Sequence, residues 1–191
     1  MKSFKIVFAL LVLSVGVFAQ TKDLGLGAFA NDKDPIMLAV DAGVASWVLG
    51  SPYVMFVVYM ASNDQKQDIA VNRKGVTLVF NGQEYQMPPF KELRKNYGAE
   101  IRDINLLRHL GKEGIASSWV RFYKFPNEGD FFPPLTVRAR IKADEGSMSG
   151  FYGFVTKCYF KNPCFKKGNK LVIRVTAKNK PELKGEVAVV L

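Results

Sequence analysis

Few residues of this chain could carry out catalysis, and His109 is its only histidine. A Ser-His-Asp or Cys-His nucleophilic device would have to use that residue. His109 ends a segment with helical periodicity, where a histidine complements the helix dipole, and no serine stands in a G-x-S-x-G pattern. A histidine-dependent hydrolase is therefore not expected, and no catalytic residue is assigned.

Paired carboxylates could serve a glycosidase, which needs two acidic groups at a defined separation. Glu84 and either Glu128 or Asp130 are conceivable partners. The sequence alone does not bring them to a defined separation. A carboxylate-dependent polysaccharide hydrolase is kept only as an alternative.

Metal ligands are equally sparse. Cys158, Cys164 and His109 lack the spacing of a zinc site, which needs three or four ligands. Residues 31–34 and 63–64 are oxygen-rich, but they do not form a D-x-D-x-D-G calcium loop, and turn chemistry explains Asn and Asp there. We expect neither a metal nor a cofactor.

The two cysteines, Cys158 and Cys164, predict a disulfide. An isolated pair usually bonds in an oxidising compartment, and Asn162-Pro163 between them favours a turn. In the chain-entropy model so small a loop contributes roughly 2–3 kcal/mol. A C-x-x-C redox motif has a different spacing, so the pair is expected to staple a β-turn.

The most unusual stretch is aromatic and covers residues 119–134. Four of its side chains alternate onto one strand face, and two phenylalanines follow in a loop before two prolines. These rings could plug the end of a core, or they could form a contact surface, because exposed aromatic patches mark recognition sites. The candidate binding residues are Trp119, Arg121, Tyr123, Phe125, Phe131 and Phe132.

The first nineteen residues predict a secretory signal peptide. Lys2 and Lys5 precede an apolar stretch, and the segment closes on Val17-Phe18-Ala19. A basic head, a short apolar core and small residues before the cut define such a signal. Cleavage after Ala19 is expected, so the mature protein is periplasmic or secreted. Membrane association is expected only through an uncleaved signal.

The chain of 191 residues is basic, with a formal net charge of +10. Its lysines and arginines are scattered over the sequence, and only Lys166-Lys167 with their neighbours resemble a patch. A solvated basic surface therefore explains the charge better than nucleic-acid binding. We expect no nucleic-acid partner, and an envelope protein or glycan partner is possible.

The mature part has the pattern of strands. Residues 53–60 are apolar throughout, which is typical of a central strand covered on both faces. Asn81-Gly82 predicts a type I′ hairpin that places Phe80 opposite Gln83 and Leu78 opposite Tyr85. Two short strands are expected at 36–40 and 44–49, and later strands at 118–125, 135–141, 151–160, 171–177 and 185–191.

One segment changes to helical periodicity. Apolar residues recur at spacings of three and four over residues 90–110, with Gly98 placed to split or bend the helix. Nine or ten short strands with one helical excursion predict a mostly all-β fold, a two-sheet immunoglobulin-like sandwich with an amphipathic helix. A small closed barrel with one helix is the alternative. The expected organisation is a signal at 1–19, a flexible lead-in at 20–34 and one domain at 35–191.

These features predict an exported, non-catalytic binding or protein-interaction module of the cell envelope or extracellular space. The second hypothesis is a small-ligand carrier with an apolar cavity lined by Tyr53, Met55, Phe56 and the aromatics of 151–160. The sequence does not name a ligand or an oligomeric state.

Overall fold

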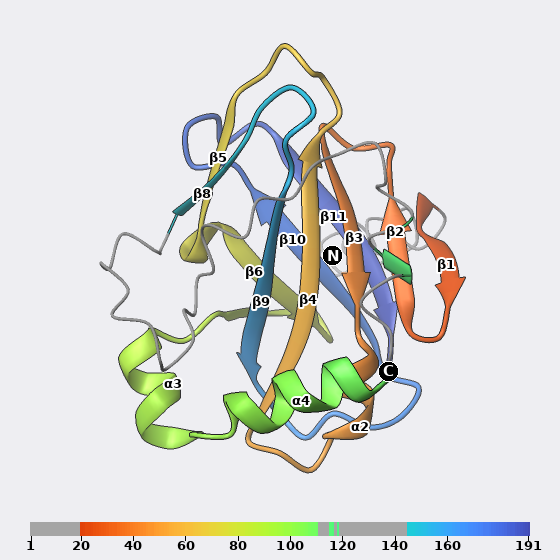
Figure 1. The fold of residues 1–191 in the computed structure, drawn as a ribbon, viewed down its shortest axis with the longest axis vertical. Helices are drawn as coiled ribbons and strands as arrows, with labels where there is room; N and C mark the ends of the chain where they lie inside the picture. Colours follow the sequence, from red (N-terminus) through yellow and green to blue (C-terminus); the bar gives the residue numbers. More distant parts are fainter. Residues whose placement is uncertain (1–19, 111–114, 117, 119–144) are drawn as a thin grey trace, which may run out of the picture.

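The computed structural model describes residues 20–110, 115–116, 118 and 145–191 (Figure 1). The chain is mostly β, and its sheets pack against one another. The predicted signal peptide, the strand expected at 135–141 and the six candidate binding residues lie outside the described residues. Of the strand expected at 118–125, only Ser118 is described, and it is helical.

The first sheet has five strands, all antiparallel, in the order β1-β2-β3-β4-β9. These are β1 (Lys22–Gly25), β2 (Ala28–Asn31), β3 (Ile36–Asp41), β4 (Tyr53–Ser62) and β9 (Phe154–Lys161). Every residue of β4 is buried, which confirms the central strand predicted from its unbroken apolar run.

The second sheet has four strands in the order β11-β10-β6-β7. These are β6 (Val76–Phe80), β7 (Gln83–Gln86), β10 (Lys170–Thr176) and β11 (Lys184–Val190). A separate two-stranded ribbon pairs β5 (Ile69–Asn72) with β8 (Glu145–Met148), and the short 3-10 helix η1 (Arg73–Gly75) links β5 to β6.

The hairpin predicted from Asn81-Gly82 is confirmed, with its register. Phe80 lies opposite Gln83 and Leu78 opposite Tyr85. Asn81 and Gly82 both have positive φ, 51° and 78°, as a type I′ turn requires.

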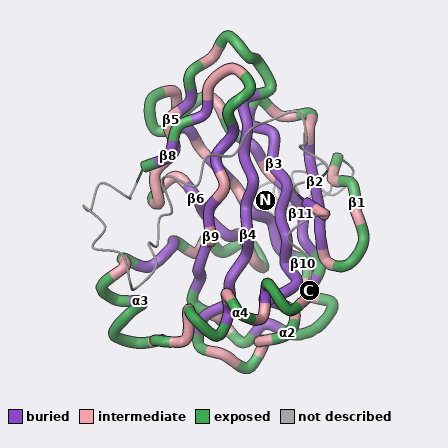
Figure 2. Tube along the Cα trace, viewed as in Figure 1, coloured by how far each residue is buried: buried purple, intermediate pink, exposed green. Residues whose placement is uncertain are grey.

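The core lies between the two large sheets, where the strands are buried along most of their length (Figure 2). Alternate residues of β10 point into it, as the sequence predicted: Leu171, Ile173 and Val175 are buried. From the first sheet, Phe56 and Phe160 meet there edge to face, with ring centroids 6.1 Å apart.

One edge of the second sheet lies against the first. The N–H of Glu186 in β11 donates to the Asp34 carboxylate at 2.8 Å, and the N–H of Ala188 donates to the Thr21 hydroxyl at 2.9 Å. The strands approach so closely that a Cβ at Gly185 would collide with the backbone carbonyl of Ile36. The side chains of Asp34 and Thr21 thus bond two backbone N–H groups of the edge strand β11 that would otherwise be unpaired.

The helices whose bounds the structure describes are α2 (Gly43–Trp47), α3 (Phe90–Asn96) and α4 (Glu100–Leu110). α3 and α4 are separated around Gly98, as the sequence predicted. α4 crosses in front of the lower part of β4 and β9, close to α2 (Figure 1).

Two sequence predictions are corrected by these elements. Residues 20–34, expected as a flexible lead-in, contain β1 and β2, because the small residues of Ala28-Phe29-Ala30 fit closely against β3. The strand expected at 44–49 is replaced by α2, whose first N–H is bonded by the Asp41 carboxylate at 2.7 Å. That local bond ends β3 and starts a helix.

The face-to-face packing fits a β-sandwich. The immunoglobulin-like connection of the strands is not confirmed by the observed sheet order, so it stays a prediction.

Candidate functional site

The first candidate site is a concave, mostly polar groove on the outer face of the second sheet, which we call the outer-sheet groove. Its volume is about 440 Å³, within the range of ligand pockets. Its charged lining residues are Lys74, Glu84, Arg174, Lys178 and Lys184. Asn72, Thr77 and Thr176 add uncharged polar groups.

Strand register explains why these residues share one face. Arg174 of β10 lies opposite Thr77 of β6 and opposite Glu186 of β11. Two residues further along β10, Thr176 lies opposite Lys184. Directly opposed residues in antiparallel strands point to the same side of a sheet, so a polar row forms above the apolar core.

The charged side chains of the groove are of two kinds, those that form ion pairs and those that do not. Arg174 forms ion pairs with both Glu84 and Glu186, and Lys178 pairs with Glu145. Neither Lys74 nor Lys184 makes an ion pair within the described residues. These two lysines give the groove its unsatisfied positive charge.

Thr77 is the unusual side chain of the groove floor. It is 8% exposed, and its hydroxyl has no hydrogen-bond partner among the residues that the structure describes. A buried hydroxyl without a partner costs about 1–3 kcal/mol, so such a group calls for an explanation.

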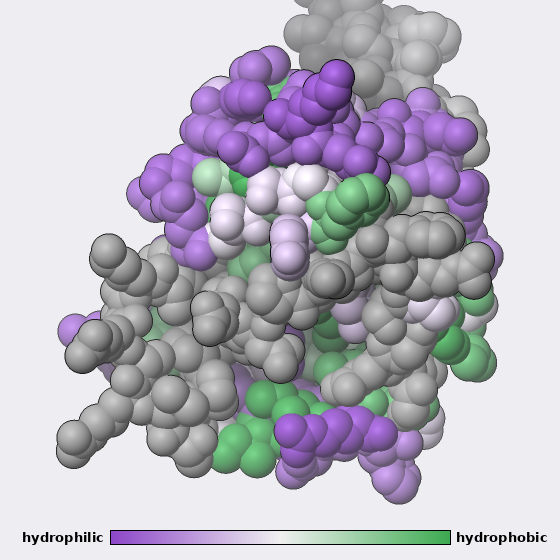
Figure 3. Space-filling model, turned by 45° about the horizontal axis from the view of Figure 1, so that its top comes forward, coloured by the Kyte–Doolittle hydropathy of each residue, from purple (hydrophilic) through white to green (hydrophobic). Residues whose placement is uncertain are grey.

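The second candidate site is the turn that connects β8 to β9, residues 149–152, which we call the aromatic tip. Ser149 and Tyr152 exchange both backbone hydrogen bonds, at 3.1 and 2.8 Å, and so fix a tight turn. Phe151 and Tyr152 are 55% and 53% exposed, while Phe154 two residues later is buried. Figure 3 looks onto this end of the molecule, where hydrophilic residues border a smaller pale and green area.

A third group of chemically active side chains holds the helices, and we call it the Asp103 cluster. Asp103 in α4 is fully buried and accepts hydrogen bonds from Tyr97 at 2.7 Å and from Arg102 at 2.9 Å. The Tyr97 ring stands 5.5 Å from that of Tyr53 and 6.0 Å from that of Tyr159. The cluster thereby fastens both helices to the outer side of β4 and β9.

Burial governs the ionisation of this cluster. It raises the pKa of Asp103, although the hydrogen bonds from Tyr97 and Arg102 oppose the change. Burial, followed by the bond to Asp103, raises the pKa of the Tyr97 phenol. The Arg102 guanidinium is exposed, and its bond to Asp103 raises its pKa. These groups are engaged with one another, which is the arrangement of a structural cluster.

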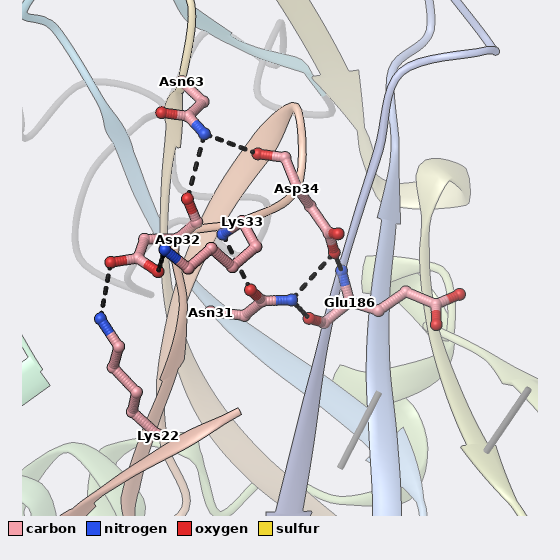
Figure 4. A network of polar contacts seen from close by, with 7 residues as sticks. All are labelled: Lys22, Asn31, Asp32, Lys33, Asp34, Asn63 and Glu186. Atoms are coloured by element: carbon pink, nitrogen blue, oxygen red, sulfur yellow. Dashed lines mark hydrogen bonds and ion pairs between the residues drawn. The ribbon is translucent and has the colours of Figure 1, made fainter. Parts of the chain in front are cut away.

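The oxygen-rich segments 31–34 and 63–64 meet in space, and Figure 4 shows the network they form. We call it the Asn31 junction, and its residues are Lys22, Asn31, Asp32, Lys33, Asp34, Asn63 and Glu186. The Asn63 amide donates to the backbone carbonyls of Asp32 and Asp34, at 3.0 and 3.2 Å.

Two carboxylates of the junction, Asp32 and Asp34, have pKa values shifted in opposite directions. The hydrogen bond from Lys22 at 2.8 Å lowers the pKa of Asp32, whereas burial raises the pKa of Asp34. Across the described ranges no group of three or more His, Cys, Asp or Glu side chains is arranged to hold a metal ion. Turn and junction chemistry accounts for these residues.

The predicted disulfide is wrong: Cys158 and Cys164, both described residues, are not bonded to each other. β9 continues for three residues beyond Cys158, to Lys161, and a strand advances about 3.3 Å per residue. The turn therefore starts too late to bring Cys164 back to Cys158. Cys158 is buried opposite Phe56, and Cys164 is exposed beside an open cavity of about 470 Å³.

The remaining sequence candidates are placed as follows. His109 is exposed in the last turn of α4. Glu84 lines the outer-sheet groove and is the one carboxylate among its described lining residues, while its proposed partners Glu128 and Asp130 lie outside the described ranges. The carrier residues Tyr53, Met55 and Phe56 are packed into the protein interior and line neither of the two cavities described above.

Comparisons with known proteins add no assignment. A scan against family models gave no match, and searches of curated proteins and of solved structures gave none either. No helix in the described ranges is long and apolar enough to cross a membrane.

Sequence reasoning missed the outer-sheet groove. Its residues come from η1, from five strands and from the loop between β10 and β11, and strand register brings the strand residues together. A usable signal did exist, because Arg174, Thr176 and Lys184 occupy the outward positions of two alternating strands.

Proposed function

We propose that the mature chain is an exported, non-catalytic binding module of the cell envelope or extracellular space, and that it docks a protein partner through exposed aromatic side chains. The immunoglobulin-like sandwich is part of the same proposal. Two packed sheets give a rigid body from which loops can present a contact surface.

The observation that carries this proposal is the aromatic tip. Two adjacent side chains, Phe151 and Tyr152, are more than half exposed in the turn between β8 and β9. Aromatic side chains lose little conformational entropy when a partner buries them, and they are enriched where proteins bind one another. The paired backbone bonds of Ser149 and Tyr152 fix the conformation of the turn that carries the two rings, which lowers the entropy lost on binding.

The anchoring of the strands on both sides of this turn supports the interpretation. Phe154 is 2% exposed, and its ring lies against Gly146, where a Cβ would collide with it. The strand residues that flank the turn are therefore held by the core, while the two rings of the turn are exposed. The aromatic segment 119–134 remains a predicted extension of this surface.

A non-catalytic role agrees with how the polar groups are used. Glu84 is engaged by Arg174, and the Asp103 carboxylate is engaged by Tyr97 and Arg102. The signal-like segment 1–19 is the basis for proposing export.

Site-specific photo-crosslinking tests this function. A photoreactive amino acid replaces Phe151 in the full chain, which is expressed in the organism that encodes it. The control protein carries the same amino acid at the exposed position Lys95 of α3. We expect a discrete set of cross-linked proteins from position 151 that is absent from position 95. The double variant F151A/Y152A should abolish capture by a purified partner found in this way, with unchanged melting. Identical products from both positions would refute the proposal.

A further inference from the structure

We propose that the outer-sheet groove is a second binding site, and that it takes an anionic saccharide, a sugar chain carrying carboxylate or sulfate groups. The site lies on the outer face of β6, β10 and β11 and shares no residue with the aromatic tip.

The first argument is the placement of the two uncompensated lysines. Lys184 lies opposite Thr176, and Thr176 in turn is close to Gly75, where a Cβ would collide with the Thr176 carbonyl. Lys74 adjoins Gly75, so the two lysines begin from opposite sides of β10. Neighbouring strands are about 4.8 Å apart, which separates the two backbones by roughly 10 Å. Two flexible ammonium groups can therefore close on one anionic group between them.

The second argument is the local charge. Arg174 is already held by Glu84 and Glu186, and Lys178 by Glu145, so these pairs contribute little attraction. Lys74 and Lys184 are exposed and make no ion pair within the described chain. A bound oxyanion would neutralise both ammonium groups and accept charge-assisted hydrogen bonds from them.

The third argument is the excess of donors over acceptors. Thr77 lies directly opposite Arg174 and carries a buried hydroxyl that has no partner among the described residues. This hydroxyl would meet a ligand after the side chain rotates toward the groove. The Asn72 side-chain oxygen accepts from the Gly75 N–H at 2.9 Å, so its amide nitrogen is the end left to donate. A ligand rich in acceptor oxygens fits this set.

The fourth argument selects a saccharide among anions. The groove holds about 440 Å³, far more than one oxyanion fills. Its described lining contains no aromatic ring, and Ala177 and Pro181 are its only apolar side chains. Single-stranded nucleic acids need stacking platforms and peptide anchors need apolar pockets. A hydroxylated chain with acidic groups needs neither.

The experiment compares three polymers of matched length: dextran sulfate, polygalacturonate and unmodified dextran. Binding to the purified mature chain is measured by calorimetry at fixed salt. The test variant K74Q/K184Q is compared with K91Q/K95Q, which removes the same charge from exposed positions of α3. A third variant, T77V, removes the buried hydroxyl while keeping the side-chain shape.

We expect at least one charged polymer to bind with about tenfold or higher affinity than dextran. K74Q/K184Q should lose most of that preference, T77V should weaken binding several-fold, and K91Q/K95Q should retain it. The preferred polymer identifies the anionic group as sulfate or carboxylate. Equal binding to all three polymers, or equal losses in both double-lysine variants, would overturn the proposal. F151A/Y152A should leave polymer binding unchanged, so this site and the aromatic tip can fail separately.

Discussion

Two buried polar side chains hold distant elements together, and they do so in different ways. Asn31 is 1% exposed and bonds mainly to the backbone: its amide donates to the Glu186 carbonyl at 2.7 Å, and its oxygen accepts from the Lys33 N–H at 2.9 Å. Asp103 is equally buried but bonds to two side chains, Tyr97 and Arg102.

The difference lies in what each residue costs to bury. A neutral amide loses little solvation when all its groups are bonded, whereas a carboxylate loses much more. The raised pKa of Asp103 records that cost. Asn31 thus joins the two sheets with a small desolvation cost, whereas Asp103 holds the helices with a larger one.

The largest effect should come from Asn31→Ala. The change leaves the part-buried Glu186 carbonyl and Asp34 carboxylate without the Asn31 amide donor. We expect the free energy of unfolding to fall by about 3 kcal/mol. Urea unfolding followed by fluorescence measures it, with the exposed Asn105→Ala as the control. A loss no larger than that of the control would show that the junction does not hold the sheets together.

Asp103→Ala should cost less, about 2 kcal/mol, because the exposed Arg102 can be solvated after the change. Asp103→Asn keeps the acceptor for Tyr97 without a buried charge, so its cost should stay below about 1 kcal/mol. The same unfolding measurements give both values. If Asp103→Asn proved as costly as Asp103→Ala, the charge itself would be stabilising, and the comparison drawn above would fail.

The smallest effect is a dependence on pH. Asp103 has a folded-state pKa above the ordinary 3.8, so its contribution is complete below that pH and is lost as pH rises through the raised pKa. Asp32 has a lowered pKa, so its contribution is present above pH 3.8 and is lost as pH falls through the lowered pKa.

Unfolding free energies between pH 3 and 7 test this contrast, comparing the wild type with Asp103→Asn and Asp32→Asn. With rising pH the wild type should lose stability relative to Asp103→Asn and gain it relative to Asp32→Asn. Parallel curves for all three proteins would contradict the assigned shifts.

The sequence predicted the features that local chemistry decides. Asn81-Gly82 admits one tight turn, and the alternation of Leu171, Ile173 and Val175 defines a core face. It failed at Val44 and Ala45, whose apolar pattern fits a strand as well as a helix; the Asp41 bond to Gly43 belongs to the helical start. It also failed at Ala28 and Ala30, because small residues form strands only where neighbours pack against them.

The candidate sites were harder to predict for a related reason. Phe151 and Phe154 are three residues apart and identical in type, yet one is exposed and the other buried. The turn that separates them depends on the bridge between Ser149 and Tyr152. The outer-sheet groove requires the register of strands far apart in the chain. Pairing at such distances is not encoded in any short stretch of sequence.

The contact of β11 with the amino-terminal strands has a consequence for the order of folding. Thr21, Asn31 and Asp34 find their partners in β11 between 152 and 167 residues later in the chain. During synthesis, β2 and β3 therefore emerge long before the strand that completes them. Contacts so far apart slow the final closure and leave early strands open to misassembly. We therefore expect the two sheets to close on each other only after residues 184–190 have been made.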